Sequence, residues 1–413
     1  MKAFAFAIAT VLCGSAAAAD LTVTPPPGLP STEVVQAWLH QDPSVQEAQA
    51  GLEAAQHAAG MLRASTHEFT TRVASQRRRY DVGPDSKEWT AQLERAIRLP
   101  GKGATDRRLG DTEIALAEAE FGEAIHEAAK DFVTLWMDWQ GAKEARVLLE
   151  EQVRFGEESL RVVASRKRAG DASTLEANVV EADTAETRAQ LSLAVTTEQK
   201  AEAKLRTRFP GSEQAALTLA EPGTIEQPLT QWNTRIQSTS DELKIAQLHY
   251  EKAQLTADRA RADRVPDPTL GVYASSEAFG GERVIGVSLS VPLPGRYRSE
   301  RLGQALSQAD MAKSALDRQE REVTIAIDAA YREATGSYER WKLAEASAAR
   351  TRDNATLTQR AYSLGEGDLQ TLLLARRQAV TAADVALSAR VSALRAYYTL
   401  LVDAHLIWGL EHD

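Results

Sequence analysis

The chain has 413 residues, a formal net charge of −10 at pH 7 and a single cysteine. No basic block stands out, and the overall negative field repels phosphate, which excludes nucleic-acid binding as a function. The one cysteine, Cys13, lies in an N-terminal targeting segment. Once that segment is removed, the chain has no disulfide, thiolate metal site or cysteine nucleophile.

Residues 1–19 have the pattern of a secretory signal peptide. Lys2 supplies the positive charge, residues 3–12 form the apolar core, and residues 17–19 (Ala-Ala-Ala) form the cleavage site. The apolar part is too short to span a membrane. Residues 20–31 are predicted to be an extended leader, because their prolines favour polyproline II over helix.

The rest of the chain reads as two copies of one unit, about 195 residues apart. A Leu-Pro-Gly-Lys junction at 99–102 is echoed by Leu-Pro-Gly-Arg at 293–296. Each junction follows a strand-like run and opens a long helix-like run. A period of this length indicates a duplicated domain and not a solenoid. The residues predicted to turn strand into helix are Pro100, Gly101, Pro294 and Gly295.

The first repeat is predicted to span residues 32–209. Apolar and alanine positions recur at three and four residues to about Ser65, which predicts one helix over this stretch. From about 67 to 99 the period is two, which predicts a β-hairpin with one apolar and one polar face. Residues 104–209 predict a helical hairpin broken at 168–173, whose first helix is roughly 100 Å long at about 1.5 Å per residue.

A connector at 210–229 leads to the second repeat at 230–410. Its first helix is stopped by Pro266 and Pro268, and a β-hairpin is predicted at about 269–293. A second helical hairpin is predicted at about 298–410, broken by Leu-Gly-Glu-Gly at 364–367.

Assembly follows from the strand count. Each predicted strand is close to the roughly 9–11 residues that a transmembrane strand needs. Four strands cannot close a barrel, and lipid does not tolerate open sheet edges, so strands in a membrane would have to come from several chains. A hairpin on a soluble domain and a solitary coiled-coil rod are the alternatives. Aromatic residues near strand ends could form a membrane girdle: Tyr80, Trp89, Tyr273, Phe279 and Tyr297. Arginines of the first hairpin would face the lumen or the headgroups: Arg72, Arg77, Arg78 and Arg79.

The doubled order of helix, β-hairpin and long helical hairpin resembles the outer-membrane efflux protein family, whose familiar member is TolC. The resemblance covers about residues 32–410. It is carried by residues 41–45, 266–272, 287–294 and 360–365. The Leu-Pro-Gly-Lys junction and the Ala-Gly-Asp-Ala-Ser run at 169–173 are most similar to the CzcC-like branch, which is associated with heavy-metal export.

The resemblance implies a mainly α fold with a small β part. A homotrimer would form a twelve-stranded outer-membrane β-barrel that continues into a periplasmic α-helical barrel. The chain would lie in the outer membrane of a Gram-negative bacterium, mostly in the periplasm. Its partners would be a periplasmic adaptor (membrane fusion protein), an inner-membrane RND-type pump and outer-membrane lipid, with no nucleic acid. The function implied is a passive exit duct of a tripartite efflux system, with heavy-metal cations among the candidate substrates.

No catalytic, cofactor or metal site is predicted, and we expect no enzyme activity. The seven histidines are scattered, and no two of them have helical metal-ligand spacing. No nucleophile elbow and no phosphate loop is present in the sequence.

The two helical tips are the predicted functional region, because the family fold places both at the periplasmic mouth. Their acids would recur around a trimer as a ring that favours cations, beside an adaptor-docking edge. Alternatively, Asp171 and Asp368 are only helix N-terminal acids stabilised by the helix dipole. The predicted aperture and docking residues are Arg168, Gly170, Asp171, Gly365, Glu366, Gly367 and Asp368.

Two further functions stay open from the sequence. One is an outer-membrane duct for type I protein secretion, which differs in its inner-membrane partner. The other is a soluble periplasmic coiled-coil scaffold or chaperone.

Overall fold

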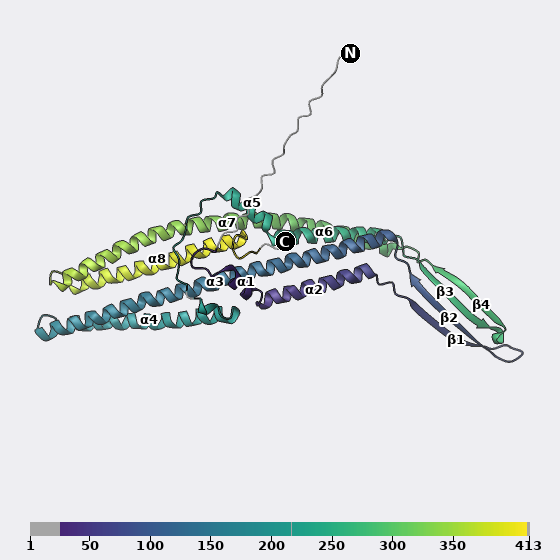
Figure 1. Ribbon diagram of the computed structural model, residues 1–413, viewed down its shortest axis with the longest axis horizontal. Coiled ribbons are helices and arrows are strands. Elements are labelled where there is room, and N and C mark those ends of the chain that lie inside the picture. The colour runs from purple at the N-terminus through teal and green to yellow at the C-terminus, as the bar shows by residue number, and fades with distance from the viewer. Residues whose placement is uncertain (1–24, 216, 411–413) are drawn as a thin grey trace, which may run out of the picture.

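The structure is a computed structural model that describes residues 25–215 and 217–410. The predicted signal peptide and the start of the leader lie outside the described residues. Figure 1 shows an elongated molecule with a small sheet at one end and the tips of two helical hairpins at the other. The first repeat contains α1 (Thr32–Leu39), α2 (Pro43–Ala64), β1 (Thr70–Arg78), β2 (Ser86–Ala96), α3 (Pro100–Ala169) and α4 (Thr174–Arg208).

The second repeat has the same order. After a short 3₁₀ turn, η1 (Ser212–Gln214), it contains α5 (Leu229–Thr239), α6 (Asp241–Ala262), β3 (Thr269–Glu277), the 3₁₀ turn η2 (Ala278–Gly280), β4 (Glu282–Ser290), α7 (Arg296–Ser363) and α8 (Leu369–Asp403). The helices α3 and α7 have 70 and 68 residues, so each is roughly 100 Å long. They run from the sheet to the tips and set the length of the molecule (Figure 1).

The prediction of a single helix from 32 to about 65 is wrong, because the chain breaks between α1 and α2. Pro43 cannot continue α1 and instead starts α2, where Asp42 caps the helix by accepting a hydrogen bond from Ser44 N–H at 2.9 Å. The second repeat breaks at Ser240, whose hydroxyl caps α6 through Leu243 N–H at 3.2 Å. Asp42 and Ser240 are 198 residues apart, so the break belongs to the duplicated unit.

The four strands form one antiparallel sheet in the order β1-β2-β3-β4. The central pairing of β2 with β3 joins the two repeats, with Leu93 opposite Val272. Strands β1 and β4 are the edges, and each has a single neighbouring strand within the chain.

The hydrophobic core lies midway along the rod, where α1, α3, α5, α8 and the segment after α8 meet. Phe132 is at its centre, with ring centroids 5.2 Å from Phe209 and 5.6 Å from Trp408. The described part of the leader packs here, since Trp136 Nε1 donates to Gly28 O at 2.9 Å. Gly28 has a φ of +94°, and a Cβ there would lie 3.1 Å from Ala220 Cβ, so this turn requires glycine.

The two long helices differ in how much surface their own chain covers. α3 packs against α2, α4, α6 and α8, and buried side chains occur along most of its length. α7 packs against α5, α6 and α8 and has far fewer buried positions. Large apolar side chains on α7 are left exposed: Leu306, Met311, Ile325, Leu343 and Leu357. Among the described residues, no helix is both long and apolar enough to cross a membrane.

Candidate functional site

The sheet has one apolar and one polar face, as the alternation in the sequence predicts. Register places most of the apolar residues of the four strands on one side, and most of these are exposed in the single chain, whereas Val284 and Tyr273 lie on the other side. Arg95 shares the apolar side, opposite Leu270. Ile285 and Val287 on the edge strand β4 are 87% and 83% exposed. The apolar face consists of Val73, Trp89, Ala91, Leu93, Leu270, Val272, Ala274, Ile285, Val287 and Leu289.

The opposite face carries a network of ion pairs. Arg72 lies 3.5 Å from Glu94, and Arg78 lies 3.0 Å from Glu88 and 3.6 Å from Glu277. These two arginines therefore project from the polar side of the sheet. By register, Arg77 is on the apolar side next to the turn, where it lies 3.6 Å from Asp85.

The aromatic residues expected to form a girdle occupy different places. Tyr80 and Phe279 stack at the turn end of the sheet, with ring centroids 5.7 Å apart. Tyr273 is on the polar face, where its ring covers Gly286, and a Cβ at Gly286 would lie 2.5 Å from Tyr273 Cζ. Trp89 is on the apolar face, and Tyr297 is exposed at the start of α7.

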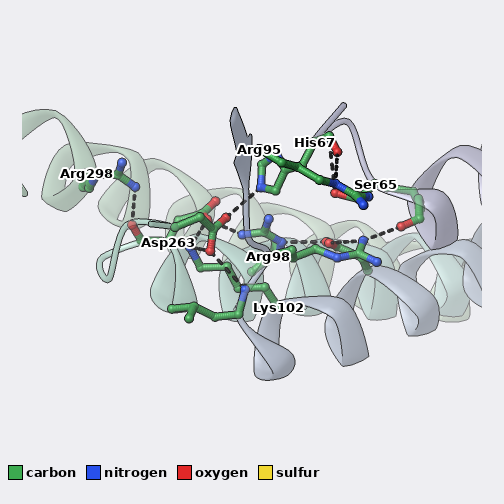
Figure 2. A network of polar contacts seen from close by, with 12 residues as sticks. Ser65, His67, Arg95, Arg98, Lys102, Asp263 and Arg298 are labelled. Atoms are coloured by element: carbon green, nitrogen blue, oxygen red, sulfur yellow. Dashed lines mark hydrogen bonds and ion pairs between the residues drawn. The ribbon is translucent and has the colours of Figure 1, made fainter. Parts of the chain in front are cut away.

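The first strand-to-helix junction is locked by a buried charge network, shown in Figure 2. Pro100 is the first residue of α3, and Lys102, two residues on, is 2% exposed. Lys102 Nζ lies 2.9 Å from Asp267 Oδ1 and 3.3 Å from Asp263 Oδ1. Asp267 also accepts from Leu99 N–H at 3.1 Å. Burial opposes ionisation, yet the Lys102 and His67 contacts outweigh it and hold the pKa of Asp267 below its usual value.

A second part of the network ties α2, α3 and α6 together. Arg98 donates to Leu62 O at 2.6 Å and Arg63 O at 2.8 Å, which satisfies carbonyls at the C-terminal end of α2. Arg98 and Arg259 both bind Asp106, at 3.0 and 2.6 Å. The junction network therefore fixes the direction in which the sheet leaves the rod.

The second junction is tied to the same network, but by residues further into α7: Arg298 donates to the backbone oxygen of Asp263 (Figure 2), and Arg301 Nη1 lies 3.5 Å from Asp263 Oδ2. Gly295 is the N-cap of α7, with Pro294 just before it in extended backbone. Arg296, which corresponds to Lys102, is 89% exposed and pairs only locally with Glu300 at 2.9 Å. A Cβ at Gly101 or at Gly295 would have no atom within 4 Å, so packing inside one chain does not require glycine at either position.

The structure places the predicted aperture residues at the two tips, at the end of the rod opposite the sheet (Figure 1). Gly170 and Gly365 have φ of +85° and +77°, so each ends its helix in the left-handed conformation. At Gly367 a Cβ would lie 3.2 Å from Tyr362 N. Arg168, Asp171, Glu366 and Asp368 are all exposed.

The two acids expected near helix N-termini occupy different positions relative to the helix caps. Asp368 is the N-cap of α8, accepting from Thr371 N–H at 2.9 Å and Thr371 Oγ1 at 2.6 Å, and these bonds lower its pKa. The N-cap of α4 is Ser173, which forms a capping box with Glu176. Asp171 lies two residues ahead of that cap, so the capping explanation holds for Asp368 alone.

The tips of the two hairpins are joined to each other. Val163 and Val180 of the first hairpin pack with Tyr362, Leu369 and Leu372 of the second in a small hydrophobic cluster. Further along, Arg377 of α8 donates through Nε and Nη2 to Asp183 of α4, at 2.9 and 2.8 Å. These contacts hold the two helical hairpins together close to their tips.

Sequence reasoning missed a cluster of ionisable groups at the middle of α3. His126 Nε2 lies 3.2 Å from Asp403 Oδ1, and Nδ1 lies 3.6 Å from Glu123 Oε2. Burial disfavours the imidazolium, but Asp403 and Glu123 outweigh burial and raise the pKa of His126 to about 9. Burial and the nearby Glu123 raise the pKa of Asp241 to about 6. The signal that could have revealed the cluster is the Glu-x-x-His spacing at 123–126, because only pairs of histidines were considered.

Comparison with solved structures identifies the fold. The CmeC outer membrane channel of Campylobacter jejuni matches with a TM-score of 0.73 and 15% identity, over 92% of this chain and 86% of that chain. The outer membrane protein VceC of Vibrio cholerae matches with a TM-score of 0.73 and 16% identity, over 90% and 95%. The open state of the Neisseria gonorrhoeae MtrE outer membrane channel matches with a TM-score of 0.66 and 18% identity, over 92% and 90%.

No family sequence profile matches the chain, and no curated protein matches it in sequence. At these identities the likeness to the solved structures establishes the fold. The comparison therefore confirms, for the fold, the resemblance to TolC-like outer-membrane channels that was inferred from the doubled order of elements.

Proposed function

Because this chain has the TolC-like fold of outer-membrane channels, we propose that three copies form the exit duct of a tripartite efflux system. The observation that carries the proposal is the sheet, which is apolar on one face, ion-paired on the other and open at both edges. Each strand has 9 or 11 residues, which matches a transmembrane strand. Three copies pair β4 of one chain with β1 of the next and close a twelve-stranded barrel.

The two faces give the barrel its inside and outside. The apolar face, with Ile285 and Val287, meets lipid, and the polar face, with Arg72 and Arg78, lines the lumen. In this orientation both arginines are paired with carboxylates on the lumen side and do not face hydrocarbon.

The rod supports the same assembly. Exposed leucines and isoleucines along α7 leave apolar surface that neighbouring copies would cover. In the trimer the helices form a periplasmic tunnel, and the two tips form its mouth. The protein is a passive conduit without enzyme activity.

At the mouth, we propose that the exposed tip residues dock a periplasmic adaptor that connects the duct to an inner-membrane pump. Arg168 and the glycines at 170 and 365 form the docking edge, and Asp171, Glu366 and Asp368 form the acidic ring. Support comes from their shared exposure and from the contacts that hold the two tips together. Crosslinking from a cysteine at 170 or 365 to the adaptor tests this edge, and absence of crosslinks from both positions contradicts it.

The acidic ring has its own test, because asparagine caps helices about as well as aspartate. Asp368→Asn keeps the cap of α8 and removes its charge, and Asp171→Asn removes a charge that caps no helix. We expect the double variant to lose cation selectivity in single-channel recordings while the trimer stays intact. Unchanged cation selectivity would contradict the acidic ring but would not contradict the proposed channel function.

The channel is tested with the purified mature protein in planar lipid bilayers. We expect extraction to need detergent, a mass of three chains, and discrete conductance steps. A protein that stays monomeric in aqueous buffer and passes no current overturns the proposal and favours a soluble periplasmic scaffold.

Heavy-metal cations are the proposed substrates, on the resemblance of the 99–102 junction and the 169–173 tip to the CzcC-like branch. A deletion strain challenged with zinc, cobalt, copper and dyes tests this directly. Sensitivity to the metals alone supports the assignment, and sensitivity to dyes alone contradicts it. Normal resistance to every compound, with a secreted protein retained in the cell, favours the type I secretion duct.

A further inference from the structure

Three metal-ligating side chains project from one face of α3, midway along the rod. Glu123, His126 and Glu127 have the spacing i, i+3, i+4, which puts them on the same side of a helix. One ligand atom from each lies within 4.8 Å of the others. His126 contacts Asp403, the last residue of α8, so the group lies where α8 ends.

The imidazole of His126 is already oriented by a carboxylate from another helix. Its Nε2 lies 3.2 Å from Asp403 Oδ1, at the last residue of α8. With Nε2–H donated to Asp403, Nδ1 faces Glu123 Oε2 across 3.6 Å, and a metal ion that binds Nδ1 displaces the proton there. Metal-bound histidines typically give their second N–H to a carboxylate in this way.

An independent observation points to a missing cation. Glu123 Oε2 is buried and accepts no hydrogen bond from any of the described residues. A buried carboxylate oxygen without a hydrogen-bond donor is unfavourable because it has lost water, and the contact of this oxygen with His126 Nδ1, at 3.6 Å, is longer than a hydrogen bond. A metal ion between this oxygen and Nδ1 would supply the missing interaction.

The acidic surroundings of the three side chains favour a dication. Asp241 packs against the same turn of α3, since a Cβ at Gly122 would lie 2.6 Å from Asp241 Oδ2. Asp241 also lines a pocket of about 720 Å³, together with Lys244 and His405 among others. Nearby Lys130 neutralises only part of the negative charge, lying 2.9 Å from Glu127 and 3.9 Å from Asp403.

We propose that Glu123, His126 Nδ1 and Glu127 bind a first-row transition-metal dication such as Zn²⁺, with Asp403 as the outer partner of the imidazole. One nitrogen and two carboxylate oxygens suit such ions, and water completes the coordination. Glu127 gives up its ion pair with Lys130 when its carboxylate binds the metal ion. The site fastens the end of α8 to α3, and it does not depend on the channel function.

Isothermal titration of tag-free, chelator-treated protein in detergent with Zn²⁺ tests the site, and Co²⁺ absorption reports ligand type. We expect one ion per chain in the wild type and loss of that ion in His126→Ala. Asp403→Asn should weaken binding by about 10- to 100-fold, because it removes only the outer partner. His249→Ala, at an exposed histidine on α6, is the matched control and should bind like the wild type.

Absence of one-to-one binding in the folded wild type overturns the proposal, and His126 is then only an ion-pair partner of Asp403 and Glu123. Equal binding by His126→Ala and His249→Ala overturns it too. If His126→Ala fails to fold, Glu127→Gln decides, because the Glu127 side chain is 50% exposed and its loss leaves the packing intact. Unchanged affinity in folded Glu127→Gln would contradict its role as a ligand.

Discussion

At the scale of single residues, two equivalent positions in the repeats have taken opposite roles. Lys102 and Arg296 each follow a Pro-Gly step at the start of a long helix. Lys102 is 2% exposed and holds Asp263 and Asp267, whereas Arg296 is 89% exposed. A buried ion pair that loses one partner leaves an uncompensated charge, while an exposed pair contributes little.

We therefore expect Lys102→Met to lower the free energy of unfolding by about 3–5 kcal/mol. The matched variant Arg296→Met should change it very little, since its pair with Glu300 is exposed to water. Thermal unfolding in detergent, followed by circular dichroism, compares the two. Equal effects would show that the buried network does not stabilise the junction.

The residue scale also gives a pH dependence, at Asp42. Burial raises the pKa of this carboxyl, but hydrogen bonds from Ser44 and Arg208 outweigh burial and lower it below the usual value. A depressed folded-state pKa contributes stability above the unfolded value of about 3.9, and that stability is lost as pH falls through the folded pKa.

We expect the unfolding temperature to decrease as the pH is lowered below about 4. Asp42→Asn should remove part of this dependence of the unfolding temperature on pH. At neutral pH the variant should be less stable by about 1–3 kcal/mol, because Arg208 loses a charged partner. Unfolding temperatures between pH 7 and pH 3 measure both effects. A slope identical to that of the wild type would rule out a contribution from Asp42.

At the scale of elements, the sheet is the part whose function depends most on which face a residue occupies. Val284 and Ile285 are neighbours on β4, but register puts Val284 on the polar face and Ile285 on the apolar face. Arginine in the middle of a lipid-facing strand costs about 2–4 kcal/mol, and lumen positions are tolerant.

Ile285→Arg should therefore reduce the amount of protein assembled in the outer membrane, while Val284→Arg should assemble normally and alter conductance. Quantitative immunoblots of membrane fractions and bilayer recordings compare the two variants. Failure of Val284→Arg with normal assembly of Ile285→Arg would mean that the faces are assigned the wrong way round.

Sequence patterns predicted the elements well where the pattern is itself the cause of the structure. The alternation at 269–274 and 285–289 exposes one apolar face because side chains in a strand point alternately to the two sides. The break between α1 and α2 was missed, since the apolar spacing continues across Pro43 and only the proline and its Asp42 cap mark it. The junction network was not predictable, because Lys102, Arg259 and Asp267 are brought together only by the packed fold. The cluster around His126 depends in the same way on Asp403, 277 residues away.

At the scale of the whole molecule, the single chain is an incomplete object. Its sheet has two open edges. The helix α7 leaves large apolar side chains exposed, whereas α3 buries most of its own apolar side chains against other parts of the chain. Leu343, midway between the core and the tip, is 74% exposed on α7. We attribute this surface to contacts between copies, which bury it on assembly.

Leu343→Glu should shift the protein from three chains toward monomers, because a carboxylate would be placed in that contact. Lys342→Glu adds the same group one residue away at an exposed, polar position and should leave the mass unchanged. Mass photometry in detergent measures both. A three-chain mass for Leu343→Glu would show that this part of α7 does not mediate assembly.

The unequal covering of α3 and α7 also means that the two halves of the gene are no longer interchangeable parts. A chimera of two first halves would bury most of its apolar surface within the chain and would leave little exposed apolar surface for contact with a neighbouring copy. A chimera of two second halves would carry the exposed apolar side chains of α7 on both rods and would lack the extensively buried helix α3. Duplication supplied two equal rods, and later divergence made one the internal skeleton and the other the outward contact.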